Sequence, residues 1–135
     1  MAARGPLGTL ADTSILIRGE RAGESPSSFA TQANGIAAIT ASELLHGVHR
    51  ADPARRLTRE HWVEELFQSM LIVPLDLTIG RVHARLWAEL SAGGNRIGPH
   101  DMLVAATALA LGWSLATLNL RDFSRVPGLS LVPLP

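Results

Sequence analysis

The sequence contains no lysine, cysteine or tyrosine, so all 12 of its basic residues are arginines. Without lysine, the chain has neither the phosphate-binding lysine of a P-loop nor an amine for Schiff-base catalysis. The absence of cysteine excludes a thiol nucleophile, a disulfide framework and a cysteine-ligated zinc site. The absence of tyrosine removes one kind of general acid. These gaps leave carboxylates, hydroxyls and histidines as the side chains available for chemistry.

An excess of charge of either sign is also missing, because 12 acidic residues balance the 12 arginines. A nucleic acid would therefore have to bind a local patch, not a wholly basic surface. With 135 residues, 47% of them hydrophobic and 18% charged, the chain is long and apolar enough for one folded domain. No apolar run is long enough to span a bilayer, and MAARGPLG lacks the apolar core of a signal peptide. We expect a cytoplasmic protein with a tail over residues 1–8 and a single domain over 9–135.

Short apolar runs alternate with segments of helical spacing. Gly19 is expected to stop the first helix, and Gly112 the helix that begins at Asp101. Such alternation is typical of a three-layer α/β/α domain around a mostly parallel sheet of four to five strands. The expected strands cover residues 7–11, 36–39, 71–75, 114–118 and 129–134. The expected helices cover residues 15–19, 29–33, 40–50, 55–70, 78–90 and 101–111.

Four acidic residues lie at the ends of strands or the starts of helices: Asp12, Glu43, Asp101 and Asp122. Ligands of parallel sheets bind beyond the carboxyl ends of the strands, where these side chains would meet. Singly, each acid has an ordinary explanation as a helix cap, a first-turn charge or a turn residue. Together they would repel one another and would need a cation. Their common edge therefore predicts a metal site.

Carboxylates with water are the ligands that Mg²⁺ and Mn²⁺ prefer, and such ions promote phosphodiester hydrolysis. Zinc is an alternative through His46 and His49, which lie three residues apart on a predicted helix, but this pair would need a third ligand. His100 adjoins Asp101 and is a further candidate for phosphate contact or proton transfer.

The order and spacing of LADTSILI, ITASELLHGV, IGPHDMLVAATALALGW and TLNLRDF resemble the PIN-domain ribonucleases, in particular the VapC-type toxins of toxin–antitoxin pairs. The resemblance covers nearly the whole chain. It implies a PIN-like fold and an endoribonuclease that depends on Mg²⁺ or Mn²⁺. It also implies a homodimer that is inhibited by a cognate VapB-type antitoxin.

The resemblance also assigns roles to individual residues. It makes Asp12, Glu43, Asp101 and Asp122 the catalytic acids and metal ligands. Four polar residues match supporting positions of the family motifs: Thr13, Ser14, Thr117 and Asn119. Arg96 and Arg121 lie on loops beside the expected site and are the predicted RNA-binding residues.

A second interpretation keeps the fold but makes the chain a protein-binding or RNA-binding module with little catalysis. The four intact acids favour the enzyme, since a binding module has no need for clustered like charges. A receiver domain would need a lysine, and a haloacid-dehalogenase phosphatase would have an acid where this chain has Ser14.

Overall fold

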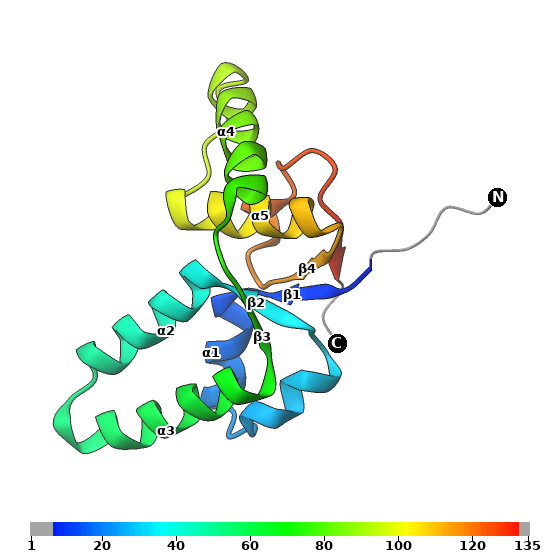
Figure 1. Cartoon of the computed structure of the whole chain (residues 1–135). Coiled ribbons are helices and arrows are strands. Elements are labelled where there is room, and N and C mark those ends of the chain that lie inside the picture. Colours follow the sequence, from blue (N-terminus) through cyan, green and yellow to red (C-terminus); the bar gives the residue numbers. More distant parts are fainter. Residues whose placement is uncertain (1–6, 133–135) are drawn as a thin grey trace.

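The computed structural model describes residues 7–132. Most of the predicted tail (residues 1–8) and the end of the last predicted strand (133–134) lie outside the described residues. Five parallel strands form one sheet in the order β3-β2-β1-β4-β5 (Figure 1). Their bounds are Thr9–Ala11 for β1, Gly35–Ala37 for β2, Leu71–Val73 for β3, Ser114–Ala116 for β4 and Leu131–Val132 for β5. The predicted α/β architecture with a parallel central sheet is confirmed.

Helices connect the strands and cover the sheet on both faces (Figure 1). On one face lie α1 (Thr13–Arg21), the 3₁₀ helix η1 (Pro26–Thr31), α2 (Ala38–Arg50) and α3 (Pro53–Ser69). On the other lie α4 (Leu77–Ala92), α5 (Pro99–Leu111) and the short α6 (Leu120–Phe123). None of the helices in the described part of the chain has the length and apolarity needed to cross a bilayer.

The strands alternate their side chains between two cores. Leu10 packs with α4 and α5, whereas its neighbour Ala11 packs with α1–α3. In β4, Leu115 likewise packs with α4 and α5, and Ala116 packs with α1–α3. This alternation follows from the period of two in an extended strand and requires apolar residues on both faces of the sheet. The strands are therefore continuous apolar runs, which is how the sequence shows them.

The strand order reverses direction beside β1. The chain steps from β1 to β2 and β3 on one side, while β4 and β5 lie on the other. Thr9 pairs with Ser114 and Ala11 with Ala116, so β1 and β4 end together. A crevice beyond two such strands is where parallel α/β sheets bind ligands. Asp12 follows β1 directly and Thr117 follows β4 directly.

Several predicted helix boundaries are wrong, because α1, α2, α3 and α5 each begin about two residues before the expected start and α1 also ends later. Helix α1 continues to Arg21 through Gly19, which is buried against the ring of Phe29 so closely that a Cβ would collide with it. Close packing, and not helix termination, accounts for this glycine. Helix α2 begins at Ala38 instead of Thr40, because β2 is only three residues long. Glu43 therefore lies in the second turn of α2.

The predicted end of α5 is confirmed. Gly112 ends α5 in the left-handed conformation, with φ of 69°, as expected for a glycine after a helix. Asp52 and Asp76 cap α3 and α4, since their carboxylates accept hydrogen bonds from Arg55 N and Ile79 N. Helix α5 is buried along its centre from Val104 to Ala108, as its apolar sequence predicts.

Candidate metal centre

Asp12 occupies the N-cap position of α1 but does not cap the helix with its side chain. This distinguishes it from the capping residues Asp52 and Asp76. The residue is only 5% exposed. A buried carboxylate that is not used for capping is costly unless other donors or a cation compensate it. The ordinary explanation of Asp12 as a helix cap is therefore wrong.

Two hydroxyl groups hold the Asp12 side chain. Thr117 Oγ1 donates to Oδ2 at 2.8 Å, and Ser14 Oγ donates to the same oxygen at 3.0 Å. Ser14 Oγ in turn accepts from the backbone N–H of Leu118, which ties the start of α1 to the end of β4. Because both bonds end on Oδ2, the oxygen Oδ1 keeps its lone pairs for another ligand.

Glu43 comes from α2 and lies beside the start of α1. Thr13 Oγ1 donates to Glu43 Oε1 at 2.9 Å. The other carboxylate oxygen, Oε2, lies 3.6 Å from His100 Nδ1. The predicted supporting residues Thr13 and Ser14 thus hold different acids, Glu43 and Asp12 respectively.

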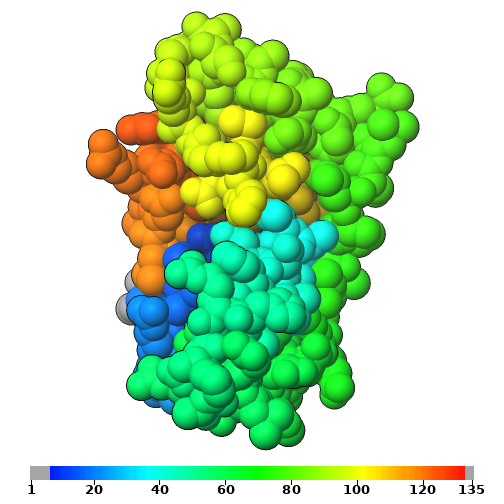
Figure 2. Space-filling model, turned by 90° about the vertical axis from the view of Figure 1, so that its left-hand side faces the viewer, coloured from blue at the N-terminus to red at the C-terminus, as the bar shows by residue number. Residues whose placement is uncertain are grey.

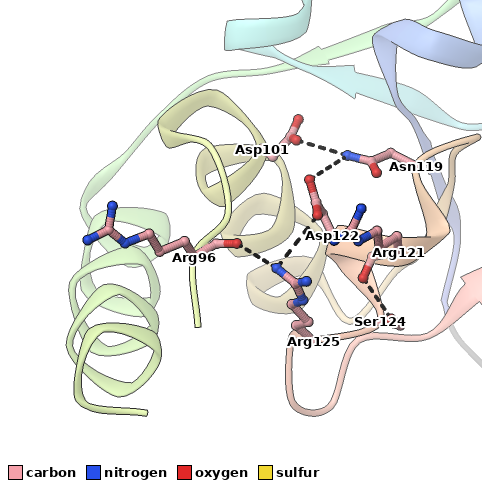
Figure 3. Close-up of polar contacts among 7 residues, drawn as sticks. All are labelled: Arg96, Asp101, Asn119, Arg121, Asp122, Ser124 and Arg125. Carbon is pink, nitrogen blue, oxygen red and sulfur yellow. Dashed lines mark hydrogen bonds and ion pairs between the residues drawn. The ribbon is translucent and has the colours of Figure 1, made fainter. Parts of the chain in front are cut away.

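Asn119 joins the remaining two acids. Its Nδ2 donates to Asp101 Oδ2 and to Asp122 Oδ2, each at 3.2 Å (Figure 3). Asp101 lies in the first turn of α5 and Asp122 in α6. One amide that donates two hydrogen bonds brings two like charges to the same place and partly offsets their repulsion.

The pKa of Asp101 is raised above its ordinary value of 3.8. Burial contributes most, because it disfavours the charged form of the carboxyl group. The negative charges of Asp12, Glu43 and Asp122 raise the pKa further, while the hydrogen bond from Asn119 opposes the shift. The charges of the other three predicted acids therefore all act on Asp101.

Four segments that are distant in sequence supply these acids. Figure 2 shows the start of α1 (blue), α2 (cyan), the start of α5 (yellow) and the region of α6 (orange) meeting on one face of the molecule. The strand ends place α1 and α6 there, and α2 and α5 approach from opposite faces of the sheet. The convergence predicted from the sequence is found in the structure.

The two predicted RNA-binding arginines occupy different surroundings. Figure 3 shows the Arg96 guanidinium directed away from Asp101 and Asp122. The Arg96 carbonyl oxygen accepts a 3.0 Å hydrogen bond from Arg125 Nη1, which also lies 3.8 Å from Asp122 Oδ1. The carbonyl of Arg121 accepts from Ser124 Oγ. Their RNA-binding roles stay predictions.

Arg125 links the loop before α5 to Asp122, a role that sequence reasoning missed. Its partner is a backbone carbonyl 29 residues away, and no motif or spacing indicates such an interaction.

The donor set suits a hard cation. The four acids offer only oxygen atoms, which Mg²⁺ and Mn²⁺ prefer. Within residues 7–132, no three acidic or histidine side chains lie close enough together to form a complete set of metal ligands. His46 and His49 therefore have no third ligand among these residues. The carboxylates are held by hydroxyl and amide donors instead. Asp12, Asp101 and Glu43 are the residues that would hold an ion.

The fold is a parallel sheet with a cluster of acids beyond β1 and β4, and the PIN domain family model matches residues 9–129. The chain belongs to the PIN-domain family and, within it, to the VapC ribonucleases. It is 35% identical over 128 residues to "Ribonuclease VapC1" of Rickettsia felis, a match that covers 93% of this chain and 96% of that protein.

Two further comparisons agree with this assignment. A "tRNA(fMet)-specific endonuclease VapC" of Salmonella typhimurium is 36% identical over 98 residues, with 71% of each chain covered. A crystal structure of DNA-bound VapBC from Salmonella typhimurium contains a chain that superposes with a TM-score of 0.84. That chain is 25% identical, and the match covers 93% of this chain and 97% of that one.

Proposed function

We propose that this protein is an endoribonuclease that hydrolyses RNA phosphodiester bonds with Mg²⁺ or Mn²⁺ bound by Asp12, Asp101 and Glu43. We also propose that it is the toxin of a toxin–antitoxin pair. The observation that carries the metal proposal is the convergence of carboxylates around Asp101, which shares the Asn119 amide with Asp122. Burial and the charges of Asp12, Glu43 and Asp122 raise the pKa of Asp101, which supports the proposal. A divalent cation among these oxygens would remove the repulsion that raises this pKa.

The metal would polarise the scissile phosphate and lower the pKa of an attacking water. The protein's own residues orient the ligands for this. Thr117 and Ser14 fix Asp12, Thr13 fixes Glu43, and Asn119 sets the positions of Asp101 and Asp122. Asp122 Oδ1 also lies 3.8 Å from Arg125 Nη1. Because Arg125 already offsets part of its charge, we propose that Asp122 acts through water or with a second ion.

The test is cleavage of end-labelled RNA by the purified chain. The substrates should include initiator tRNA, because one relative is named for its action on tRNA(fMet). We expect cleavage with Mg²⁺ or Mn²⁺ and none in excess chelator. Undiminished cleavage in chelator would contradict the metal mechanism. A chain that binds RNA and never cuts it would support the binding-module interpretation.

The residues are tested by Asp12→Asn and Asp101→Asn, with Asp76→Asn as the matched control. Asp76 carries the same carboxylate, but it caps α4. The two site variants should lose cleavage and remain folded, while the control should cut normally and keep its stability, because asparagine caps a helix about as well as aspartate. Wild-type rates in either site variant would refute the assignment.

The regulatory proposal concerns a VapB-type antitoxin. Its support is the superposition of this chain on a chain of the VapBC structure from Salmonella typhimurium. Co-expression of the product of the neighbouring reading frame should yield a complex that no longer cuts RNA. The homodimer stays a prediction, and light scattering of the free chain would test it.

A further inference from the structure

A groove of about 480 Å³ leads away from the acidic cluster between α1, α2 and α3. Thr13, Glu43 and His100 line it at the cluster end. Gly47 forms part of its floor on α2, where a Cβ would lie 4.0 Å from Arg59 Nη1. Figure 2 shows α1 (blue) beside the α2–α3 hairpin (teal), on the side of the molecule that carries the acidic cluster.

Arginines surround this groove on three sides. Arg21 comes from the end of α1, Arg50 from the end of α2, and Arg59 from α3. Glu43 is its single acidic lining residue in the described part of the chain. Arg59 is partly neutralised by Glu20, 3.1 Å away. In the described residues no ion pair joins Arg21 or Arg50 to an acid, so their charges face the groove uncompensated.

The positive charge continues into an adjacent hollow of about 340 Å³, which shares Arg21 and Arg59 with the groove and adds Arg55. Arg21 and Arg50 lie in the last turns of their helices, where a cation stabilises the helix dipole. Arg55 lies in the first turn of α3 and has a partner there, since its Nε lies 3.9 Å from Oδ2 of the N-cap residue Asp52. Glu20 also lines the hollow. The helix dipole does not fix where the side chains of Arg21 and Arg50 lie, and both line the groove.

We propose that this groove binds the phosphate backbone of single-stranded RNA on one side of the scissile bond, with Arg21 and Arg50 as the principal phosphate-binding residues. The inference rests on the proposed function and specifies where its substrate lies. A polyanion held by arginines along the groove would reach Glu43 at the end where the carboxylates and their cation act. An acidic protein segment would satisfy the same arginines, but it would bring no phosphodiester bond to the cluster.

The test measures binding of a fluorescent single-stranded oligoribonucleotide by anisotropy at several salt concentrations. It compares Asp101→Asn, which prevents cleavage, with the same chain carrying Arg21→Gln and Arg50→Gln. Glutamine keeps much of the aliphatic stem and removes the charge. The matched control carries Arg81→Gln and Arg85→Gln on α4, on the opposite face of the sheet. Thermal melts establish that all chains are folded.

We expect the groove variant to bind RNA more weakly at about 50 mM salt. Its salt-dependence slope should be smaller by about 1.4, because each of the two arginines neutralises one phosphate and accounts for ~0.7 of the slope. In the wild-type background the same pair should raise KM more than it lowers kcat. The control pair should bind like its parent. Equal affinity and slope in the groove variant and the control would overturn the proposal, whatever the nuclease activity.

Parallel assays separate the two proposals. If the wild-type chain cuts RNA with Mn²⁺ and the groove variant binds RNA like the control, only the proposed RNA-binding role of the groove is wrong. If the wild-type chain neither cuts nor binds RNA, both proposals fail. If the groove variant binds RNA as before but binds poly-L-glutamate more weakly, the groove would be assigned to an acidic protein partner. That result would also overturn the proposal that the groove binds RNA.

Discussion

Thr117 Oγ1 donates a 2.8 Å hydrogen bond to Asp12 Oδ2, although the two residues lie 105 positions apart in the chain. The bond crosses from the end of β4 to the end of β1, the two strands between which the sheet reverses its order. Thr117 is fully buried and Asp12 nearly so. The bond therefore connects the stability of the fold to the position of a proposed metal ligand.

The Thr117–Asp12 bond predicts a loss of stability in Thr117→Val. The substitution keeps the shape of the side chain and removes a donor to a buried carboxylate. We expect the free energy of unfolding in urea to fall by about 1.5 to 3 kcal/mol, the usual contribution of a hydrogen bond to a charged group. Cleavage should also weaken, because Asp12 loses one of its two hydroxyl donors.

The matched control for that change is Thr40→Val. Thr40 is also fully buried, but its Oγ1 has no hydrogen-bond partner among the described residues. Removing an unsatisfied hydroxyl should leave the free energy of unfolding unchanged or raise it. If the two valine variants lose equal stability, the Thr117–Asp12 bond has no special energetic role.

Asp101 predicts a pH dependence of stability in the metal-free protein. Its pKa is raised in the folded state, so the native chain binds more protons than the unfolded chain between the two pKa values. Stability therefore falls as the pH rises from 3.8 through the raised pKa, and the full penalty is present above it. Asp101→Asn removes this penalty.

Thermal melts in chelator would measure the effect. At neutral pH Asp101→Asn should melt at a higher temperature than the wild-type chain. Its advantage should shrink as the pH is lowered through the raised pKa of Asp101, where the wild-type carboxyl group takes up its proton. An advantage that grows on acidification would mean that the carboxylate is stabilised in the fold, contrary to the repulsion inferred for it.

Replacement of glycine by alanine should change the free energy of unfolding in opposite directions at Gly35 and Gly80. A Cβ at Gly35 would lie 2.5 Å from the carbonyl oxygen of Leu71, its partner in the adjacent strand β3. Gly35→Ala should lower the free energy of unfolding by about 1 to 3 kcal/mol through overpacking. A Cβ at Gly80, in α4, would meet nothing within 4 Å. Gly80→Ala should stabilise the chain by about 0.5 to 1 kcal/mol, and urea titration of both variants would check the contrast.

The alternation of strands and helices could be predicted from the sequence because the central strands β1, β2 and β4 are largely buried and read as short apolar runs. The start of α4 and the end of α5 were predictable as well, since Asp76 and Gly112 carry local capping chemistry. The role of Gly19 was not, because the ring of Phe29 that requires a glycine there comes from a separate element. Contacts between distant elements have no local signal in the chain.

The candidate site was likewise predictable from the sequence only in part. Strand ends and helix starts predicted that Asp12, Glu43, Asp101 and Asp122 converge, and the resemblance to the family supplied their roles. The specific hydrogen bonds, such as the double donation by Asn119, depend on side-chain geometry that spacing does not contain. The groove arginines Arg50 and Arg59 lie outside the sequence segments that resemble the family, and their common groove forms only when α1, α2 and α3 are placed together.

Titration of Mn²⁺ into the metal-free wild-type chain and into Asp101→Asn, followed by calorimetry, tests the central claim most directly. The carboxylate cluster predicts that the wild-type chain binds Mn²⁺, that binding raises its melting temperature, and that Asp101→Asn loses both effects. No binding by the wild-type chain at about millimolar Mn²⁺, or equal binding by both chains, would contradict a metal centre built from these four acids.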